Sequence, residues 1–234
     1  MRSRIFIQKI KMPILNRYNL AFCFLLSLSY TALGQGNPET INPIERIALV
    51  AGQQSLEGIT QLQFTFQVER DAKVLRAREW TWNLQTQDVT LKDGATTTTY
   101  NRSQPMDSLQ TLADKSFVND TYWLLPQYKF YTDSGTQVIT KEKTVAPIAK
   151  TPLNLFTIIY GDAGGYTPGD AYDVYYNDDY VLQEWAYRAG NGSNVNLQNT
   201  FANHQTFNGL TVATEHIFAD GKTNIKLTNI AVTR

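Results

Sequence analysis

The chain has 234 residues, and its 21 lysine and arginine residues balance 21 aspartate and glutamate residues. Five of the basic residues and none of the acidic ones precede residue 35, so residues 35–234 carry 16 basic against 21 acidic side chains, a net charge of −5. Because contacts to phosphates need a basic face, nucleic acid is excluded as a partner of this region. The only cysteine, Cys23, excludes an internal disulfide framework.

Residues 1–34 have the composition of a secretory signal peptide. The five basic residues lead into the apolar stretch Leu20–Tyr30, and Ala32-Leu33-Gly34 supplies a small-x-small cleavage site. The apolar stretch is too short to span a membrane as a mature helix. We therefore expect an exported protein, periplasmic or secreted, whose mature chain of residues 35–234 is a single domain without a transmembrane anchor.

Residues 42–54 are predicted to begin with a short amphipathic helix. Asn42 is a good N-cap residue, Pro43 suits the first helical position, and Glu45 completes a capping box. Apolar residues fall on one face of this segment, so the helix is expected to lie on another element.

The chain from residue 61 to residue 100 is predicted to form strands. Apolar and polar residues alternate from Gln61 to Glu69 and again from Glu79 to Gln85, which gives each strand one apolar and one polar face. Antiparallel sheets covered on one side have this pattern. Residues 86–100 are predicted to form a hairpin around the Asp93-Gly94 turn.

Residues 104–130 interrupt the strands. Leu109, Leu112, Ala113 and Phe117 have helical spacing, so this insertion is expected to cover the sheet or to fill its concave side. A loop at residues 144–152 follows. Strands are then predicted at 153–161, 171–177, 180–188, 197–206, 210–218 and 223–233. The elements together indicate a mainly β protein with short helices, of the α+β class.

Few residues suit catalysis or metal binding. His204 and His216 lack a third ligand and a metal-binding spacing. Residues 162–179 hold five aspartates, a composition compatible with paired catalytic carboxylates or a calcium loop, but their glycine and proline neighbours favour turns. We therefore predict no catalytic residue, no metal ligand and no cofactor. A carbohydrate-acting hydrolase that uses the Asp162–Asp179 loop stays as an alternative.

Large apolar side chains on alternating strand positions are more informative. A sheet that carries so many rings must bury them, either against packed helices or around an acyl-sized cavity, and tyrosine and tryptophan suit such a wall. The candidate wall of a ligand cavity consists of Phe64, Phe66, Trp80, Trp82, Tyr172, Val174, Tyr176, Trp185 and Tyr187.

The order of elements, and the hairpin "DAYDVYYNDDYVLQEWAYR" in particular, resembles the exported lipoprotein-carrier superfamily. The last eighty residues are also similar to a group of exported Bacteroidetes-type proteins of unassigned function near that superfamily. The resemblance implies an unclosed antiparallel β half-barrel with helices on its concave face. It further implies that Tyr172, Val174 and Tyr176 share one apolar face with their partners Trp185 and Tyr187. It supplies no catalytic residue, and it suggests that Arg76 or Arg78 latches a lid.

The leading hypothesis is thus a non-enzymatic exported protein whose concave face binds an apolar ligand such as a lipid, an acyl chain or a lipidated protein. The alternatives are the hydrolase and a structural or interaction module whose interior is fully packed and holds no ligand.

Overall fold

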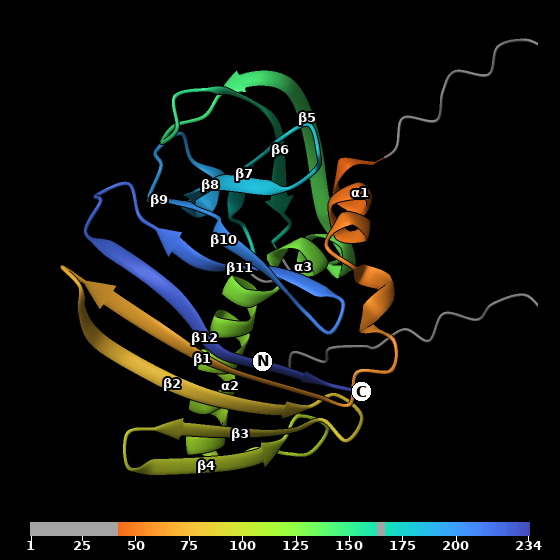
Figure 1. Cartoon of the computed structure of the whole chain (residues 1–234), viewed down its shortest axis with the longest axis vertical. Coiled ribbons are helices and arrows are strands. Elements are labelled where there is room, and N and C mark those ends of the chain that lie inside the picture. Colours follow the sequence, from red (N-terminus) through yellow and green to blue (C-terminus); the bar gives the residue numbers. More distant parts are fainter. Residues whose placement is uncertain (1–41, 163–166) are drawn as a thin grey trace, which may run out of the picture. The chain divides into compact units, whose positions relative to one another are not determined.

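The structure is a computed structural model that describes residues 42–162 and 167–234 (Figure 1). The predicted signal peptide lies outside the described residues. The strands form two antiparallel sheets, neither of which closes on itself. Mainly β structure, unclosed antiparallel sheets and helices on their inner faces confirm the predicted fold class, whereas the division into two sheets was not predicted.

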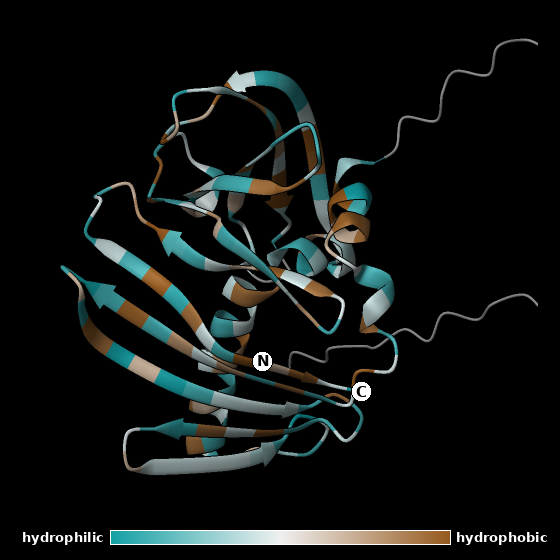
Figure 2. Ribbon diagram, in the orientation of Figure 1, coloured by the Kyte–Doolittle hydropathy of each residue, from teal (hydrophilic) through white to brown (hydrophobic). Residues whose placement is uncertain are grey.

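The large sheet has the strand order β10-β11-β12-β1-β2-β3-β4. Its central pairing joins β1 to β12, with Gln61 opposite Thr233 and Arg70 opposite Thr223. Brown and teal segments alternate along β1, β2 and β12 in Figure 2, as the sequence pattern predicts for strands with one covered face. The strands are β1 (Gln61–Arg70), β2 (Lys73–Asn83), β3 (Asp88–Asp93), β4 (Thr96–Asn101), β10 (Ala202–Phe207), β11 (Leu210–Ile217) and β12 (Thr223–Thr233).

The small sheet is a simple meander in which each strand pairs with the next one along the chain. Its strands are β5 (Thr136–Val145), β6 (Pro152–Tyr160), β7 (Ala171–Tyr176), β8 (Leu182–Arg188) and β9 (Leu197–Thr200). The strand predicted at 197–206 is divided: β9 pairs with β8, and β10 pairs with β11. The break falls at Phe201, whose buried ring packs between Trp185 and His216, with centroids 5.3 and 5.0 Å away.

Helix α1 (Pro43–Val50) begins with Asn42 as N-cap and Pro43 in its first turn, as the sequence predicts, whereas the predicted capping box with Glu45 is not formed. The Asn42 side chain accepts a hydrogen bond from the Ile44 amide at 3.0 Å. The apolar face of α1 is buried, and a 3-10 turn, η1 (Gln53–Leu56), follows it. The remaining short helix, η2 (Ala189–Asn191), follows β8.

The predicted insertion forms α2 (Ser108–Leu124) and α3 (Pro126–Thr132). A capping box between Asp107 and Gln110 starts α2. Ala113 and Phe117 are buried, whereas Leu109 and Leu112 are 70% and 63% exposed, so only two of the four apolar residues at helical spacing are covered. The first half of α2 is buried on one side only. Residues 120–124, in its second half, are all buried, because the second half lies between the two sheets (Figure 1).

Candidate functional site in the interior between the sheets

The nine predicted wall residues divide between the two sheets. Phe64, Phe66, Trp80 and Trp82 lie on β1 and β2, and the other five lie on β7 and β8. Seven of the nine are buried, and Trp82 and Tyr187 are half-buried. Register places Tyr172 opposite Tyr187 and Val174 opposite Trp185, which puts these four side chains on one face of the small sheet.

Rings of α2 occupy the space in front of both walls. Phe117 makes edge contacts with Trp80 and Trp82, each with centroids 5.4 Å apart. Tyr122 stacks on Trp185 at 6.0 Å, and Trp123 meets the same indole edge-on at 5.0 Å. The predicted wall is therefore packed against a helix in this conformation, and none of its nine residues lines either of the two hollows described below.

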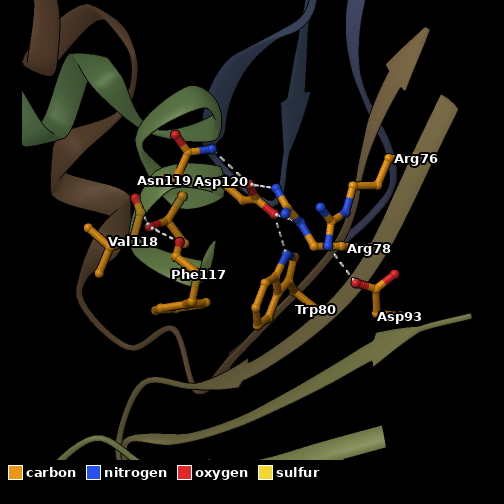
Figure 3. A network of polar contacts seen from close by, with 9 residues as sticks. Arg76, Arg78, Trp80, Asp93, Phe117, Val118, Asn119 and Asp120 are labelled. Atoms are coloured by element: carbon orange, nitrogen blue, oxygen red, sulfur yellow. Dashed lines mark hydrogen bonds and ion pairs between the residues drawn. The ribbon is translucent and has the colours of Figure 1, made fainter. Parts of the chain in front are cut away.

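A buried ion pair attaches α2 to the large sheet (Figure 3). The Arg78 guanidinium of β2 donates to both carboxylate oxygens of Asp120, at 2.7 and 2.5 Å, and the Trp80 indole N–H donates to Asp120 Oδ2 at 2.8 Å. Asp120 is fully buried, Arg78 is 8% exposed, and the guanidinium lies over the Phe66 ring. Burial raises the pKa of Asp120, and the hydrogen bonds from Arg78 oppose that rise.

A chain of hydroxyl groups attaches the same helix to the small sheet. Tyr122 shares a hydrogen bond with the Tyr160 hydroxyl, which donates in turn to Asp133 Oδ2 at 2.9 Å. Burial raises the pKa of Tyr122 well above its ordinary value and also raises that of Asp133. Helix α2 is thus hydrogen-bonded to both sheets by its second half.

A small, mainly apolar pocket lies beneath α1. Its volume is about 40 Å³, and its walls include Ile47, Val50, Leu182, Phe201 and Ala213. Since one water molecule takes up about 30 Å³ of liquid volume, this pocket is too small for an acyl chain while α1 is in place. The end of α1 is held at the Ala51 carbonyl, which accepts hydrogen bonds from the Tyr128 hydroxyl and the Thr211 amide.

A larger groove of about 360 Å³ opens between the β10–β11 hairpin and β12. The hairpin contributes Asn203, Gln205, Phe207, Thr214 and Glu215, and β12 contributes residues 226–230. No sequence pattern indicated this groove, because its walls come from three strands whose relative tilt no local pattern encodes.

The two histidines, for which no metal site is predicted, lie in different environments. His216 is fully buried on β11 against the rings of Trp123 and Phe201, whereas the His204 side chain is exposed on β10. Burial lowers the pKa of His216 to about 3. Among residues 42–162 and 167–234, no cluster of three histidine, cysteine or acidic side chains is placed to hold a metal ion.

The aspartates of the Asp162–Asp179 loop are distributed along β7 and its two ends. Asp170 accepts from the Tyr187 hydroxyl at 2.8 Å, and Asp173, within β7, pairs with Arg188. Asp178 pairs with Lys143 at the opposite end of β7. Six residues of strand separate the two ends by about 20 Å, so Asp170 and Asp178 do not face each other across a cleft.

In the described part of the chain, no helix has the length and apolar character needed to cross a membrane. Comparison of the sequence with family models and with curated proteins gives no match.

Proposed function

We propose that this protein is exported, to the periplasm or beyond the cell, and that it binds an apolar ligand such as a lipid, an acyl chain or the lipid of a lipidated protein without acting on it. The observation that carries the proposal is the mainly apolar pocket beneath α1, which borders the aromatic interior at Phe201. In this proposal α1 is a lid, and the described conformation is the closed one.

The apolar part of the attachment of α1 is small compared with the burial of an acyl chain. Its buried apolar contacts come from Ile44, Ile47 and Ala48, and burying one isoleucine side chain stabilises by about 1.5–3 kcal/mol. A chain of about ten methylenes, at about 0.8 kcal/mol each, contributes about 8 kcal/mol when it is buried. The ligand therefore more than offsets the contacts that the two isoleucines lose.

Blocking the pocket tests this proposal. Ala213 lines it and is 6% exposed, so Ala213→Leu fills a space of this size, whereas Ala231→Leu adds the same atoms on an exposed part of β12. Wild type and Ala231→Leu are expected to bind cis-parinaric acid by fluorescence titration and to co-purify with lipid in native mass spectrometry. Ala213→Leu is expected to bind at least about tenfold more weakly, the effect of about 1.4 kcal/mol.

Thermal unfolding of each variant establishes that it is folded, and Ala51→Leu, on the α1 side of the pocket, replaces Ala213→Leu if that variant does not fold. If the wild-type protein purifies without lipid and does not bind cis-parinaric acid, the proposal is contradicted. That result favours the second candidate, an interaction module without a ligand, which is supported by the packing of α2 rings against both aromatic walls.

A further inference from the structure

The groove between the β10–β11 hairpin and β12 is closed at both ends and open along its length. At one end the two strands pair, with Glu215 opposite Lys226. At the other end the hairpin turn reaches β12, where the Asn208 side chain donates to the Val232 carbonyl at 3.2 Å and Arg234 donates to the Asn208 carbonyl at 2.9 Å. This geometry limits the ligand to a short one, and about 360 Å³ lies at the lower end of the range for small-molecule sites.

The groove is separate from the pocket beneath α1. Asn203, Gln205 and Phe207 line the groove, whereas His204, between them on the same strand, lines the pocket. Since successive residues of a strand point to opposite faces, the hairpin forms a wall between the two sites. A ligand of the groove is consequently different from the apolar ligand proposed above.

The polar side chains of the groove suit an uncharged ligand with many hydroxyl groups. Asn203 and Gln205 each offer an amide donor and an amide acceptor, and Glu215 offers a carboxylate acceptor. Within the part of the chain that the structure describes, these three side chains make no hydrogen bond. The single ammonium group, on Lys226, is paired with Glu69 at 2.8 Å, so the groove has no free cation for a phosphate or a sulfate.

Apolar groups face the same space. Phe207 and Ile230 are half-buried along it, and Leu227, which is 2% exposed, belongs to the hydrophobic core beneath it. A ring with hydroxyl groups on its edge and C–H groups on its faces matches such a surface, because the amides bind the edge and the phenyl ring covers a face. A fully apolar chain leaves the amides unpaired, and an anionic ligand lacks a counter-ion.

From this lining we infer that the groove binds a neutral saccharide of one or two sugar units. Gln205 and Asn203 bind its hydroxyl groups, Glu215 accepts from one of them, and Phe207 packs against a sugar face. The inference is independent of the proposed lipid site, because the two sites share no residue and take different ligands.

Isothermal titration calorimetry with maltose, cellobiose and N,N′-diacetylchitobiose tests the inference on the whole exported chain. Wild type is expected to bind at least one of the three with a Kd in the micromolar to millimolar range. Gln205→Ala and Phe207→Ala are each expected to weaken that binding at least about tenfold. Gln137→Ala removes an equally exposed glutamine on β5 and is expected to leave the Kd unchanged.

Binding of cis-parinaric acid by the same variants separates the two proposals, since Gln205→Ala and Phe207→Ala leave the pocket beneath α1 intact. Failure of all three sugars to bind wild type overturns the saccharide site whatever the fatty-acid result is. Equal weakening in Gln137→Ala also overturns it, and so does an extended peptide that binds in the groove while the sugars do not.

Discussion

Both sheets cover the helices with aromatic side chains, but the strands of the two sheets are connected differently along the chain. Strands β5 to β9 of the small sheet follow one another in sequence. The large sheet joins two such meanders through β1 and β12, where paired residues are 153 to 172 positions apart. Closing so long a loop costs more entropy than forming a hairpin, so the large sheet depends more on side-chain contacts that hold its parts together.

The attachments of α2 differ in the same way. Toward the large sheet, the most buried contact is the ion pair between Arg78 and Asp120, which has lost nearly all its water; the half-buried pair Arg102–Asp114 and a hydrogen bond from the Gln110 side chain to the Thr99 carbonyl add to it. Toward the small sheet, it is a chain of neutral hydroxyl groups that ends at Asp133. The contacts of α2 with the large sheet thus include a buried charged pair, whereas its buried polar contacts with the small sheet come from hydroxyl groups.

Breaking the ion pair is expected to have the largest effect. Asp120→Ala leaves the Arg78 guanidinium buried without its partner, so the free energy of unfolding should fall by about 3–5 kcal/mol in urea titrations. The double variant Arg78→Met/Asp120→Leu should recover part of this loss, because two apolar side chains replace both charges while the buried Trp80 indole N–H stays without its acceptor.

The exposed pair Arg76–Asp93 on the same sheet is the control, and Asp93→Ala should cost at most about 1 kcal/mol. Hydrogen exchange of Asp120→Ala should show lower protection in β1 and β2 than in β6 and β7. Equal loss of protection in both sheets would contradict the expectation that the ion pair stabilises mainly the large sheet.

The second effect depends on pH and concerns His216 at the junction of the sheets. Its folded pKa of about 3 lies below the ordinary value near 6.5, so only the unfolded chain takes up a proton between these values. The stability contributed by the neutral ring is complete above pH 6.5 and is lost as the pH falls toward 3. Between pH 6.5 and 4.5 the loss should be about 2–3 kcal/mol in chemical denaturation.

Substituting each histidine separately shows which of them causes this decline of stability with falling pH. His216→Leu should flatten the decline of stability below pH 6.5, and His204→Gln, on an exposed position of β10, should preserve most of it. An identical decline in wild type and His216→Leu would show that other groups cause it.

The smallest effect is expected within the small sheet. Glu184 is buried, and its carboxylate accepts the amide hydrogens of Ile148 at 2.8 Å and Ala149 at 2.6 Å, which fixes the loop between β5 and β6. Glu184→Gln places an amide group against one of these donors and should cost about 1–3 kcal/mol. Exchange of the Ile148 and Ala149 amides should accelerate while β1 and β12 keep their protection, and Glu142→Gln on exposed β5 should change neither.

Alternation in the sequence predicted β1 and β2, because each has one covered face. Strands were also predicted after residue 171, although β7 is buried on both faces and β10 is exposed along most of its length. Alternation failed for β5, whose side chains are almost all exposed and therefore carry no alternating pattern. The break at Phe201 was not predictable either, since the residues on both sides of it favour strands and only the packing of its ring separates the two sheets.

The same limits apply to the candidate sites. The predicted wall residues do line the interior, but no sequence pattern states whether helices fill the space before them. One signal was available for the ion pair: Arg78 falls in phase with Trp80 and Trp82 on an apolar face, and Asp120 falls in phase with Ala113 and Phe117. A charge at such a position on both elements is typical of a buried pair.

The Ala51 carbonyl links the β10–β11 hairpin to α1. It accepts the Thr211 amide of β11, so the wall between the two proposed sites is hydrogen-bonded to the end of the proposed lid. If an occupied groove and a displaced helix require different positions of that hairpin, the two binding events are thermodynamically linked. The factor by which a sugar changes the affinity for a fatty acid then equals the factor by which the fatty acid changes the affinity for the sugar.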